Sequence, residues 1–448
     1  MTPAPAMRAP LALIFTLFAA GYFLSYCFRS VGPLIAPDLM RELQLDAGQL
    51  GLLASAYFLT FAIAQPFIGI AMDRHGPARI NAVLFAVAAA GAAVFALGES
   101  IATLALGRAL IGLGVSGALM TALKALVVWY PLRQREALSS VMMAVGGMAA
   151  MIASVPAELA MRSIGWRGLF WVLGAASVIV AAALWWRLSA RYLTENGFQS
   201  HSPERDRVQG AMPMAAAPNP ATDDAVQRAI AGGFRTIFTS RIFAAYIPIA
   251  FFSSGGFSAV QSLWAGPWLI DAAGHSRASA AGVLFVFGLA MFAGYVLTAF
   301  ITARLQSVPG APRRFYAGSL ALAYTALGVI VANAWASSSL PWFALGITVG
   351  AGMLAYPALT RAFPAAIAGR VVTAYNMVMF VGAFFLQWGI GALIQWMLDG
   401  GAATLQAYQV SFGALLLMQV LALAWFWALS RSRSPVAALA SETERERS

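Results

Sequence analysis

Charged residues, cysteine and histidine are all scarce in this chain of 448 residues. Asp, Glu, Lys and Arg together make up 10% of it, and it contains one cysteine, Cys27, and three histidines. A single cysteine excludes an intramolecular disulfide, and the scattered histidines lack metal-ligand spacing, so we predict no metal site and no cofactor. So few charges also leave too little polar surface to cover a compact water-soluble domain.

Hydrophobic residues, by contrast, make up 60% of the chain. They come in runs of roughly 20 or more, the length at which a helix crosses a hydrocarbon core of about 30 Å. We therefore predict an all-α membrane protein with about twelve transmembrane helices in the lipid bilayer. The expected spans are 11–37, 47–72, 79–98, 101–128, 137–160, 167–188, 241–270, 278–304, 314–335, 341–362, 371–398 and 406–429.

Basic residues outnumber acidic ones, with 28 Lys and Arg against 17 Asp and Glu. In a soluble protein this excess would suggest a nucleic-acid partner, but here the basic residues gather at alternate breaks between the apolar runs. That distribution sets membrane orientation, since Lys and Arg are retained on the cytoplasmic side. We therefore expect no nucleic-acid partner. We expect a multi-pass protein of the cell inner membrane with both termini and the central loop in the cytoplasm.

The middle of the chain, residues 189–240, is polar and rich in proline, so most of it cannot bury enough apolar surface to fold. We predict a partly disordered cytoplasmic linker there, with a short helix from Thr222 to Ala231 at the membrane surface. The linker divides the chain into an N-terminal six-helix bundle, 1–188, and a C-terminal six-helix bundle, 241–430. A cytoplasmic tail, 431–448, follows.

The two halves also match each other in sequence. Residues 29–35, with Gly-Pro at their centre, parallel residues 263–269 in the seventh expected span, and Trp129-Tyr130-Pro131 parallels Ala362-Phe363-Pro364. A duplication is the simplest explanation. It predicts two pseudo-symmetric bundles that can rock about a site between them.

A motif follows the second span, from Gly69 to Arg79. It resembles the signature between spans two and three of the major facilitator superfamily. Gly69 would permit close helix approach, Asp73 would pair with nearby guanidinium groups, and Gly76 would allow a tight turn. With Arg74 and Arg79 these residues form the expected gating motif.

The resemblance implies a monomeric secondary active transporter of a small organic solute that works by alternating access. It implies no enzymatic activity, and the sequence shows no nucleophile–base pair. One alternative is a proton antiporter that exports drugs or metabolites, although residues 154–157 lack the Gly-Pro pair and following glycine that mark such exporters. Another alternative is a sensor that keeps the fold without moving a substrate.

Arg29 carries the substrate hypothesis. It lies in span one, three residues after Tyr26, and a guanidinium in hydrocarbon costs at least about 2.5 kcal/mol unless it faces a partner or a wet cavity. Its geometry suits carboxylate, phosphate or sulfonate, so we expect an organic anion as substrate. Organophosphate exchangers and organic-anion symporters of the superfamily likewise carry an arginine in span one. The alternative is a structural arginine bonded to backbone carbonyls or displaced toward the outer interface.

Other binding candidates lie on spans that the superfamily places around its cavity. Lys124, the only lysine, lies on span four and either contacts the anion or extends to the membrane interface. The remaining candidates could instead serve helix packing or interhelical hydrogen bonds. They are Gln261 and Trp264 on span seven, Tyr356 on span ten, and Asn376 and Gln387 on span eleven.

Coupling to protons requires a titratable group inside the protein. Glu158, near the outer end of span five, is the main candidate, although its neighbours Arg162 and Arg167 favour a structural salt bridge. Arg108 on span four could be the partner of Glu158 or could itself relay coupling, as the superfamily's arginine there is thought to do. The coupling ion stays open, with protons as a candidate.

Overall fold

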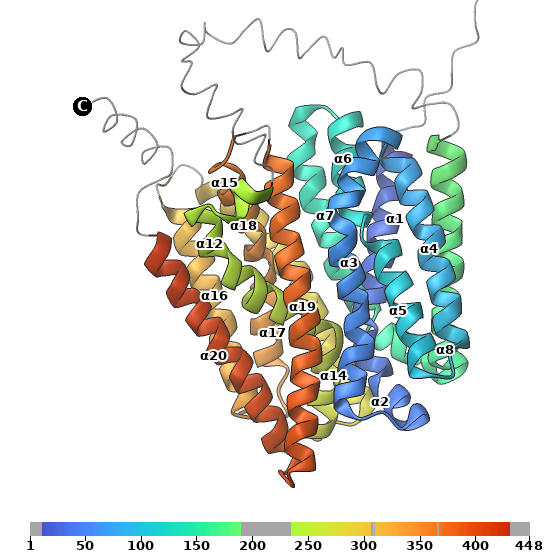
Figure 1. Ribbon diagram of the computed structural model, residues 1–448, viewed down its shortest axis with the longest axis vertical. Coiled ribbons are helices and arrows are strands. Elements are labelled where there is room, and N and C mark those ends of the chain that lie inside the picture. Colours follow the sequence, from blue (N-terminus) through green and yellow to red (C-terminus); the bar gives the residue numbers. More distant parts are fainter. Residues whose placement is uncertain (1–10, 190–233, 306–307, 309, 365–366, 431–448) are drawn as a thin grey trace, which may run out of the picture.

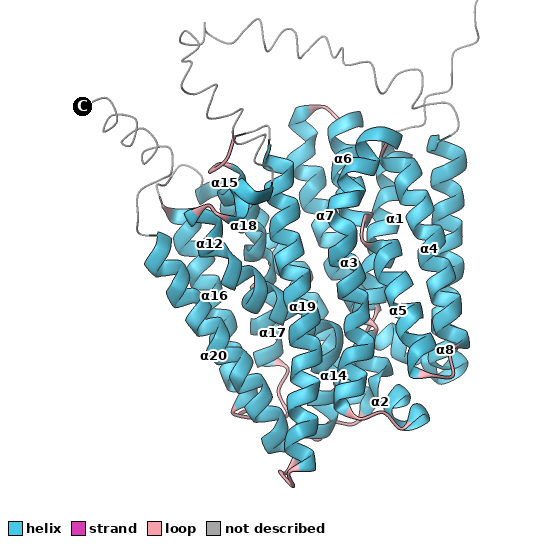
Figure 2. Cartoon of the chain, viewed as in Figure 1, coloured by secondary structure: helices cyan, strands magenta, loops and turns pink. Residues whose placement is uncertain are grey.

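The computed structural model describes residues 11–189, 234–305, 308, 310–364 and 367–430. Nearly all of these residues are helical, and none of them forms a strand (Figure 2). The expected helix from Thr222 to Ala231 and the expected tail after residue 430 lie outside the described residues. The prediction of an all-α protein is therefore confirmed for the part of the chain that the structure describes.

The first half consists of helices that begin and end at recognisable local signals. Asp46 caps the third helix by accepting a hydrogen bond from Gln49 N, and Ser100 caps the fifth by accepting from Thr103 N. The helices are α1 (Leu11–Ser30), α2 (Gly32–Leu43), α3 (Ala47–His75), α4 (Pro77–Leu97), α5 (Ile101–Val115), α6 (Ala118–Trp129), α7 (Leu132–Ile152) and α8 (Val155–Leu184), with a π turn, η1 (Trp185–Ser189), at the end.

In the second half, two of the spans are assembled from several short helical pieces. Span seven runs through α12 (Arg241–Pro248), η2 (Ile249–Ser254), α13 (Gly255–Ala259), η3 (Val260–Trp264), α14 (Ala265–Pro267) and η4 (Trp268–Ala272), and span ten through α17 (Leu340–Ile347), η5 (Val349–Leu354) and α18 (Ala355–Thr360). The others are α15 (Arg277–Leu305), α16 (Ala311–Val331), α19 (Ala368–Asp399) and α20 (Thr404–Ser430).

Among the described residues, 11 helices are long and apolar enough to cross a membrane. The remaining expected span corresponds to the shorter apolar helix Ala137–Ile152 together with the beginning of α8. At Gly165 the backbone of α8 leaves helical geometry, with φ 66° and ψ 175°, a region that essentially only glycine adopts. This kink separates the fifth span from the sixth, so the described helices account for all the expected spans.

The helices form two groups that lie side by side, α1 to α8 and α12 to α20 (Figure 1). Two helix pairs join the groups, since α3 packs along α19 and α7 packs along α15. In Figure 1, α2 and α14 lie at one end of the molecule, hereafter the α2 end, and α6 lies at the other. This arrangement leaves the inner faces of both groups to form a shared central site.

Candidate functional site

A cavity of about 170 Å³ lies between the two groups of helices. Its walls come from α1, α3, α5 and α6 of the first half and from span seven, α15, α16, span ten, α19 and α20 of the second. Every wall is therefore helical, and both halves contribute. Five of the binding residues expected from the sequence line it: Tyr26, Arg29, Gln261, Tyr356 and Asn376.

Arg29 is the only charged side chain among the described residues that line this cavity. Its guanidinium carbon lies 5.1 Å from the ring centre of Tyr26, 5.4 Å from Phe61 and 5.3 Å from Phe380, so aromatic rings of both halves surround it. It makes no ion pair with any described residue, and its Nε is buried without a hydrogen-bond partner, although the Tyr57 hydroxyl lies close to the guanidinium. The structural alternative, an arginine bonded to backbone carbonyls, does not occur in this conformation.

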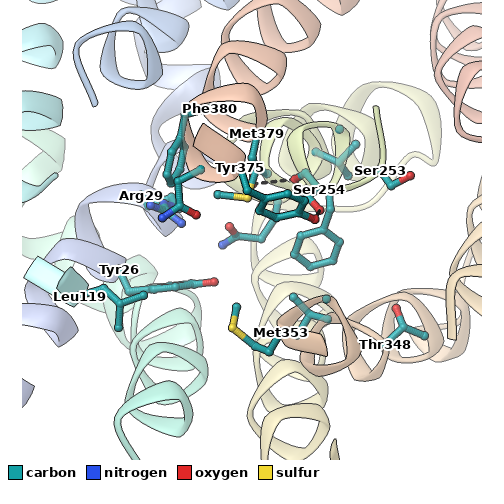
Figure 3. A pocket seen from close by; sticks show the side chains of 18 of the residues that line it. Tyr26, Arg29, Leu119, Ser253, Ser254, Thr348, Met353, Tyr375, Met379 and Phe380 are labelled. Atoms are coloured by element: carbon teal, nitrogen blue, oxygen red, sulfur yellow. Dashed lines mark hydrogen bonds between the residues drawn. The ribbon is translucent and has the colours of Figure 1, made fainter. Parts of the chain in front are cut away.

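Three other expected residues hydrogen-bond to neighbours across the site. Tyr356 Oη donates to Asn376 Oδ1 at 2.6 Å, which joins span ten to α19. Gln261 Nε2 donates to Ser30 Oγ at 2.8 Å, which joins the two halves. Figure 3 shows Arg29 near Phe380 and Tyr26 on one side of the cavity, with Met353 and Met379 farther in.

Trp264, Gln387 and Lys124 do not line the cavity. Trp264 is fully buried, and its Nε1 donates to the backbone oxygen of Gln387 at 2.8 Å. Gln387 Oε1 in turn accepts from Ser262 Oγ at 3.2 Å. Both side chains therefore hold span seven against α19, while Lys124 lies half-buried on α6. Substrate contact by these three is not supported by this arrangement.

Gln65 on α3 is a lining residue that the sequence analysis missed. Its Nε2 donates to the backbone oxygen of Ser116 at 3.2 Å, across the break between α5 and α6. Several tyrosines of the second half also line the cavity and were not predicted from the sequence, among them Tyr295, Tyr316 and Tyr375. In the sequence, these residues are marked only by a polar side chain within an apolar run. Polar residues that form interhelical hydrogen bonds away from any cavity show the same pattern.

At the α2 end the duplicated Gly-Pro segments cross each other, and we call this contact the glycine crossing. A Cβ placed on Gly32 would lie 2.0 Å from Ser262 O, and one on Gly266 would lie 2.1 Å from Pro33 O. Because no side chain fits at either position, the two backbones are in direct contact. The repeat thus brings its two copies together where the cavity is closed.

An ion pair reinforces the closure beside the glycine crossing. Arg277 on α15 donates to both carboxylate oxygens of Asp38 on α2, at 2.8 and 2.5 Å. It also donates to Leu34 O at 3.3 Å, and its Nε lies 4.0 Å from Glu158 Oε1. Asp38 and Arg277 belong to different halves, so this pair ties the halves together at the α2 end. The sequence analysis did not identify either residue as functional.

Glu158, a coupling candidate, is held mainly by its own helix. Arg162 Nε lies 3.0 Å from both carboxylate oxygens of Glu158, as expected from their spacing. The expected contribution of Arg167 is wrong, because Arg167 pairs with Glu42 instead. Glu42 also accepts from Trp166 Nε1 at 2.8 Å. Although partial burial opposes ionisation, the hydrogen bonds from Trp166 and Arg167 hold the pKa of Glu42 below its usual range.

Arg108, the other coupling candidate, is not the partner of Glu158. Its Nη1 donates to the backbone oxygen of Phe28 at 3.2 Å, and its guanidinium carbon lies 5.1 Å from the ring centre of Phe95. It is buried within the first half and outside the cavity lining. Arg108 therefore binds α5 to α1, next to the glycine crossing.

The expected gating motif lies at the end of the molecule opposite the α2 end. Gly76 joins α3 to α4 with φ 79° and ψ 156°, which agrees with a tight turn that requires glycine. The close helix approach expected at Gly69 is absent from this conformation, since a Cβ there would meet nothing within 4 Å among the described residues. Arg74 is exposed, Arg79 is half-buried, and the side chain of Asp73 lies outside what the structure describes.

Comparison with known proteins agrees with this architecture. The family model of the Major Facilitator Superfamily matches residues 18–387. The chain therefore belongs to the major facilitator superfamily, a family of multi-pass membrane proteins. Among solved structures, a D-xylose–proton symporter matches with a TM-score of 0.69 at 16% identity, over 94% of this chain and 98% of that one. This likeness concerns the fold.

Curated relatives match part of the chain. A probable sulfoacetate transporter of Cupriavidus necator is 27% identical over 202 residues, which cover 43% of this chain and 47% of the relative. A hexuronate transporter of Escherichia coli K12 is 30% identical over 168 residues, 37% of this chain and 39% of the relative. The matches thus span about half the length of these relatives or less.

Proposed function

We propose that this chain is a secondary carrier that moves a small organic anion through the membrane by alternating access. One observation carries the proposal: among its described lining residues the cavity has a single guanidinium, that of Arg29, which has no ion-pair partner, and it has no carboxylate. A cation kept in largely apolar surroundings without a carboxylate partner is costly, and a bound anion compensates for that cost. The same lining disfavours an exporter of cations.

The relatives support the choice of an anion. Sulfoacetate and hexuronate, named for two of them, are both organic acids. Their matches are partial, so the substrate itself comes from the cavity and not from those names. We expect the carrier to act as a monomer.

The proposed movement uses the two halves as rigid units, 1–188 and 241–430, connected by the linker 189–240. The basic loops predict that both termini are cytoplasmic and, in a bacterium, that the membrane is the inner one. The α2 end then faces outward, and the glycine crossing with the Asp38–Arg277 pair forms the outer gate in its closed state. Opening this gate would expose Arg29 to the outside.

Protons remain the candidate coupling ion. The cavity lining contains no acid among its described residues, so an acid of the outer gate is the more suitable carrier of a proton. Opening of the gate would remove Arg277 from Asp38 and from Glu158. Glu158→Gln should then abolish uphill accumulation driven by a pH gradient while downhill exchange persists.

Counterflow in proteoliposomes tests the proposal. Vesicles preloaded with an unlabelled organic acid should accumulate the same acid in radiolabelled form, with glucuronate, sulfoacetate and benzoate as first probes. Arg29→Gln should abolish the accumulation because the cavity then has no charge. Lack of counterflow with every acid of a broad panel would contradict a carrier and favour a sensor.

A further inference from the structure

The cavity restricts the number of charges and the shape of its substrate as well as the sign of the charge. We propose that it binds a singly charged carboxylate or sulfonate whose body is mostly apolar and about the size of one six-membered ring. A dianion and a polyhydroxylated sugar acid are both poorer ligands of this site. The inference rests on the proposed function, because it requires Arg29 to hold the anionic head.

The number of charges follows from the cations within reach. Arg29 is the only one in the described lining, and Lys124 lies outside it on α6. Arg277 lies beyond the glycine crossing and already holds Asp38. A second negative charge on the ligand would enter the cavity without a cation and would lose its hydration. The site therefore favours a monoanion.

The size of the body follows from the volume. The cavity measures about 170 Å³. For comparison, an apolar protein cavity of about 150 Å³ accommodates benzene. A ring with one acidic substituent is therefore of a size that matches this space.

The apolar character follows from the walls. Phe257, Met353, Met379 and Leu119 present carbon and sulfur to the cavity. In Figure 3, Met353 and Met379 lie between Arg29 on one side and Ser253 and Thr348 on the other. Methionine adapts its shape to a ring of either geometry, aromatic or saturated.

Most polar groups of the lining are hydrogen-bonded within the protein; the exceptions among the described residues include Gln65 Oε1 and Tyr316 Oη, which are buried away from the ligand space. Tyr356 pairs with Asn376, and Gln261 pairs with Ser30. Ser258 Oγ donates to Ser254 O at 2.9 Å. A site that recognises many hydroxyl groups keeps matching donors and acceptors free for them, since a hydroxyl that loses water without gaining a partner lowers affinity. This lining therefore suits a ligand with few hydroxyl groups.

Binding to the purified full-length chain in lipid nanodiscs, followed by calorimetry, tests this inference. The probes share a ring and differ in one property each: benzoate and cyclohexanecarboxylate are apolar monoanions, terephthalate is a dianion, glucuronate is a polyhydroxylated monoanion, and benzamide is neutral. We expect both apolar monoanions to bind at least about tenfold more tightly than terephthalate or glucuronate. Benzamide should not bind.

Variants separate the charge from the body. Arg29→Gln should abolish the preference for benzoate over benzamide. Met353→Asn should weaken benzoate, whereas the matched Met353→Leu should retain it. Tighter binding of glucuronate or terephthalate than of benzoate would overturn the inference while leaving an anion carrier in place. Absence of binding by every anion, with benzamide bound, would overturn the proposed function as well.

Discussion

Replacing Arg277 with Gln should open the outer gate. Its side chain is 35% exposed and that of Asp38 is 13% exposed, so solvent screens this pair less than an ordinary surface ion pair. The substitution leaves no acid without a cation, because Asp38 still accepts from Arg41 at 3.0 Å and Glu158 still holds Arg162. The effect is therefore the loss of the link between the halves and not a stranded buried charge.

The magnitude follows from the hydrogen bonds of the Arg277 guanidinium that are lost, two to the Asp38 carboxylate and a longer one to Leu34 O. For a partly exposed pair of this kind we assign about 1–2 kcal/mol of the free-energy difference between closed and open gate. The open population should then rise roughly 5- to 30-fold, as long as the closed state predominates in the parent protein.

Labelling of an introduced cysteine measures that population. Leu34 is 3% exposed and lies next to the glycine crossing, so the thiol of Leu34→Cys reacts with a bulky maleimide only when the gate opens. The native Cys27 is replaced by Ala in this background. We expect Arg277→Gln to accelerate labelling roughly 5- to 30-fold.

Arg167→Gln is the matched control for this experiment. The Arg167–Glu42 pair joins α8 to α2 within the first half, so its loss should leave the labelling rate unchanged. An unchanged rate in Arg277→Gln, or an equal rise in both variants, would refute the assignment of the Asp38–Arg277 pair as a gate between the halves.

Three further predictions follow from the same geometry. Gly32→Ala should hold the glycine crossing open and reduce counterflow at least about tenfold. The control Gly282→Ala, where a Cβ meets nothing within 4 Å, should leave counterflow unchanged. Equal counterflow in the two variants would contradict the role of the glycine crossing. Gly165→Ala should lower the free energy of unfolding by about 1–3 kcal/mol through backbone strain alone, and an unchanged melting temperature would contradict this. Because the pKa of Glu42 is lowered in the folded protein, its contacts contribute fully above about pH 4.3 and are lost as the pH falls through that lowered pKa. The side chain is 43% exposed, so the melting-temperature difference between the parent and Glu42→Gln should correspond to at most about 1 kcal/mol. The difference should shrink as the pH falls below about 4.3, and a difference that grows in acid would contradict the sign.

The spans and the duplication are predictable from the sequence because the bilayer imposes both length and apolar character on each helix. The position of Arg29 in the cavity lining is predictable for a related reason, since a guanidinium within an apolar span requires a compensating environment. The duplicated Gly-Pro segments are visible in the sequence as a repeat. The contact between the two segments cannot be predicted from the sequence, because a sequence repeat does not show whether its two copies touch in the fold.

The Asp38–Arg277 ion pair and part of the cavity lining could not be predicted from the sequence. Asp38 and Arg277 are 239 residues apart, and each lies near the end of a span, where a charge needs no explanation. The sequence left the role of Trp264 open, because helical spacing puts it on one face with Gln261 without showing how far along the helix the cavity extends. Gln261 lines the cavity, whereas Trp264 lies one turn beyond and packs against α19.

The central claim is that the guanidinium of Arg29 holds the anionic head of the substrate. Calorimetric titration of the parent, Arg29→Lys and Arg29→Gln with the acid that counterflow identifies tests it most directly. We expect Arg29→Lys to bind more weakly than the parent and Arg29→Gln to lose at least about tenfold in affinity, because a charge-assisted hydrogen bond contributes about 1.5–3 kcal/mol. Equal affinity in all three proteins would contradict the claim.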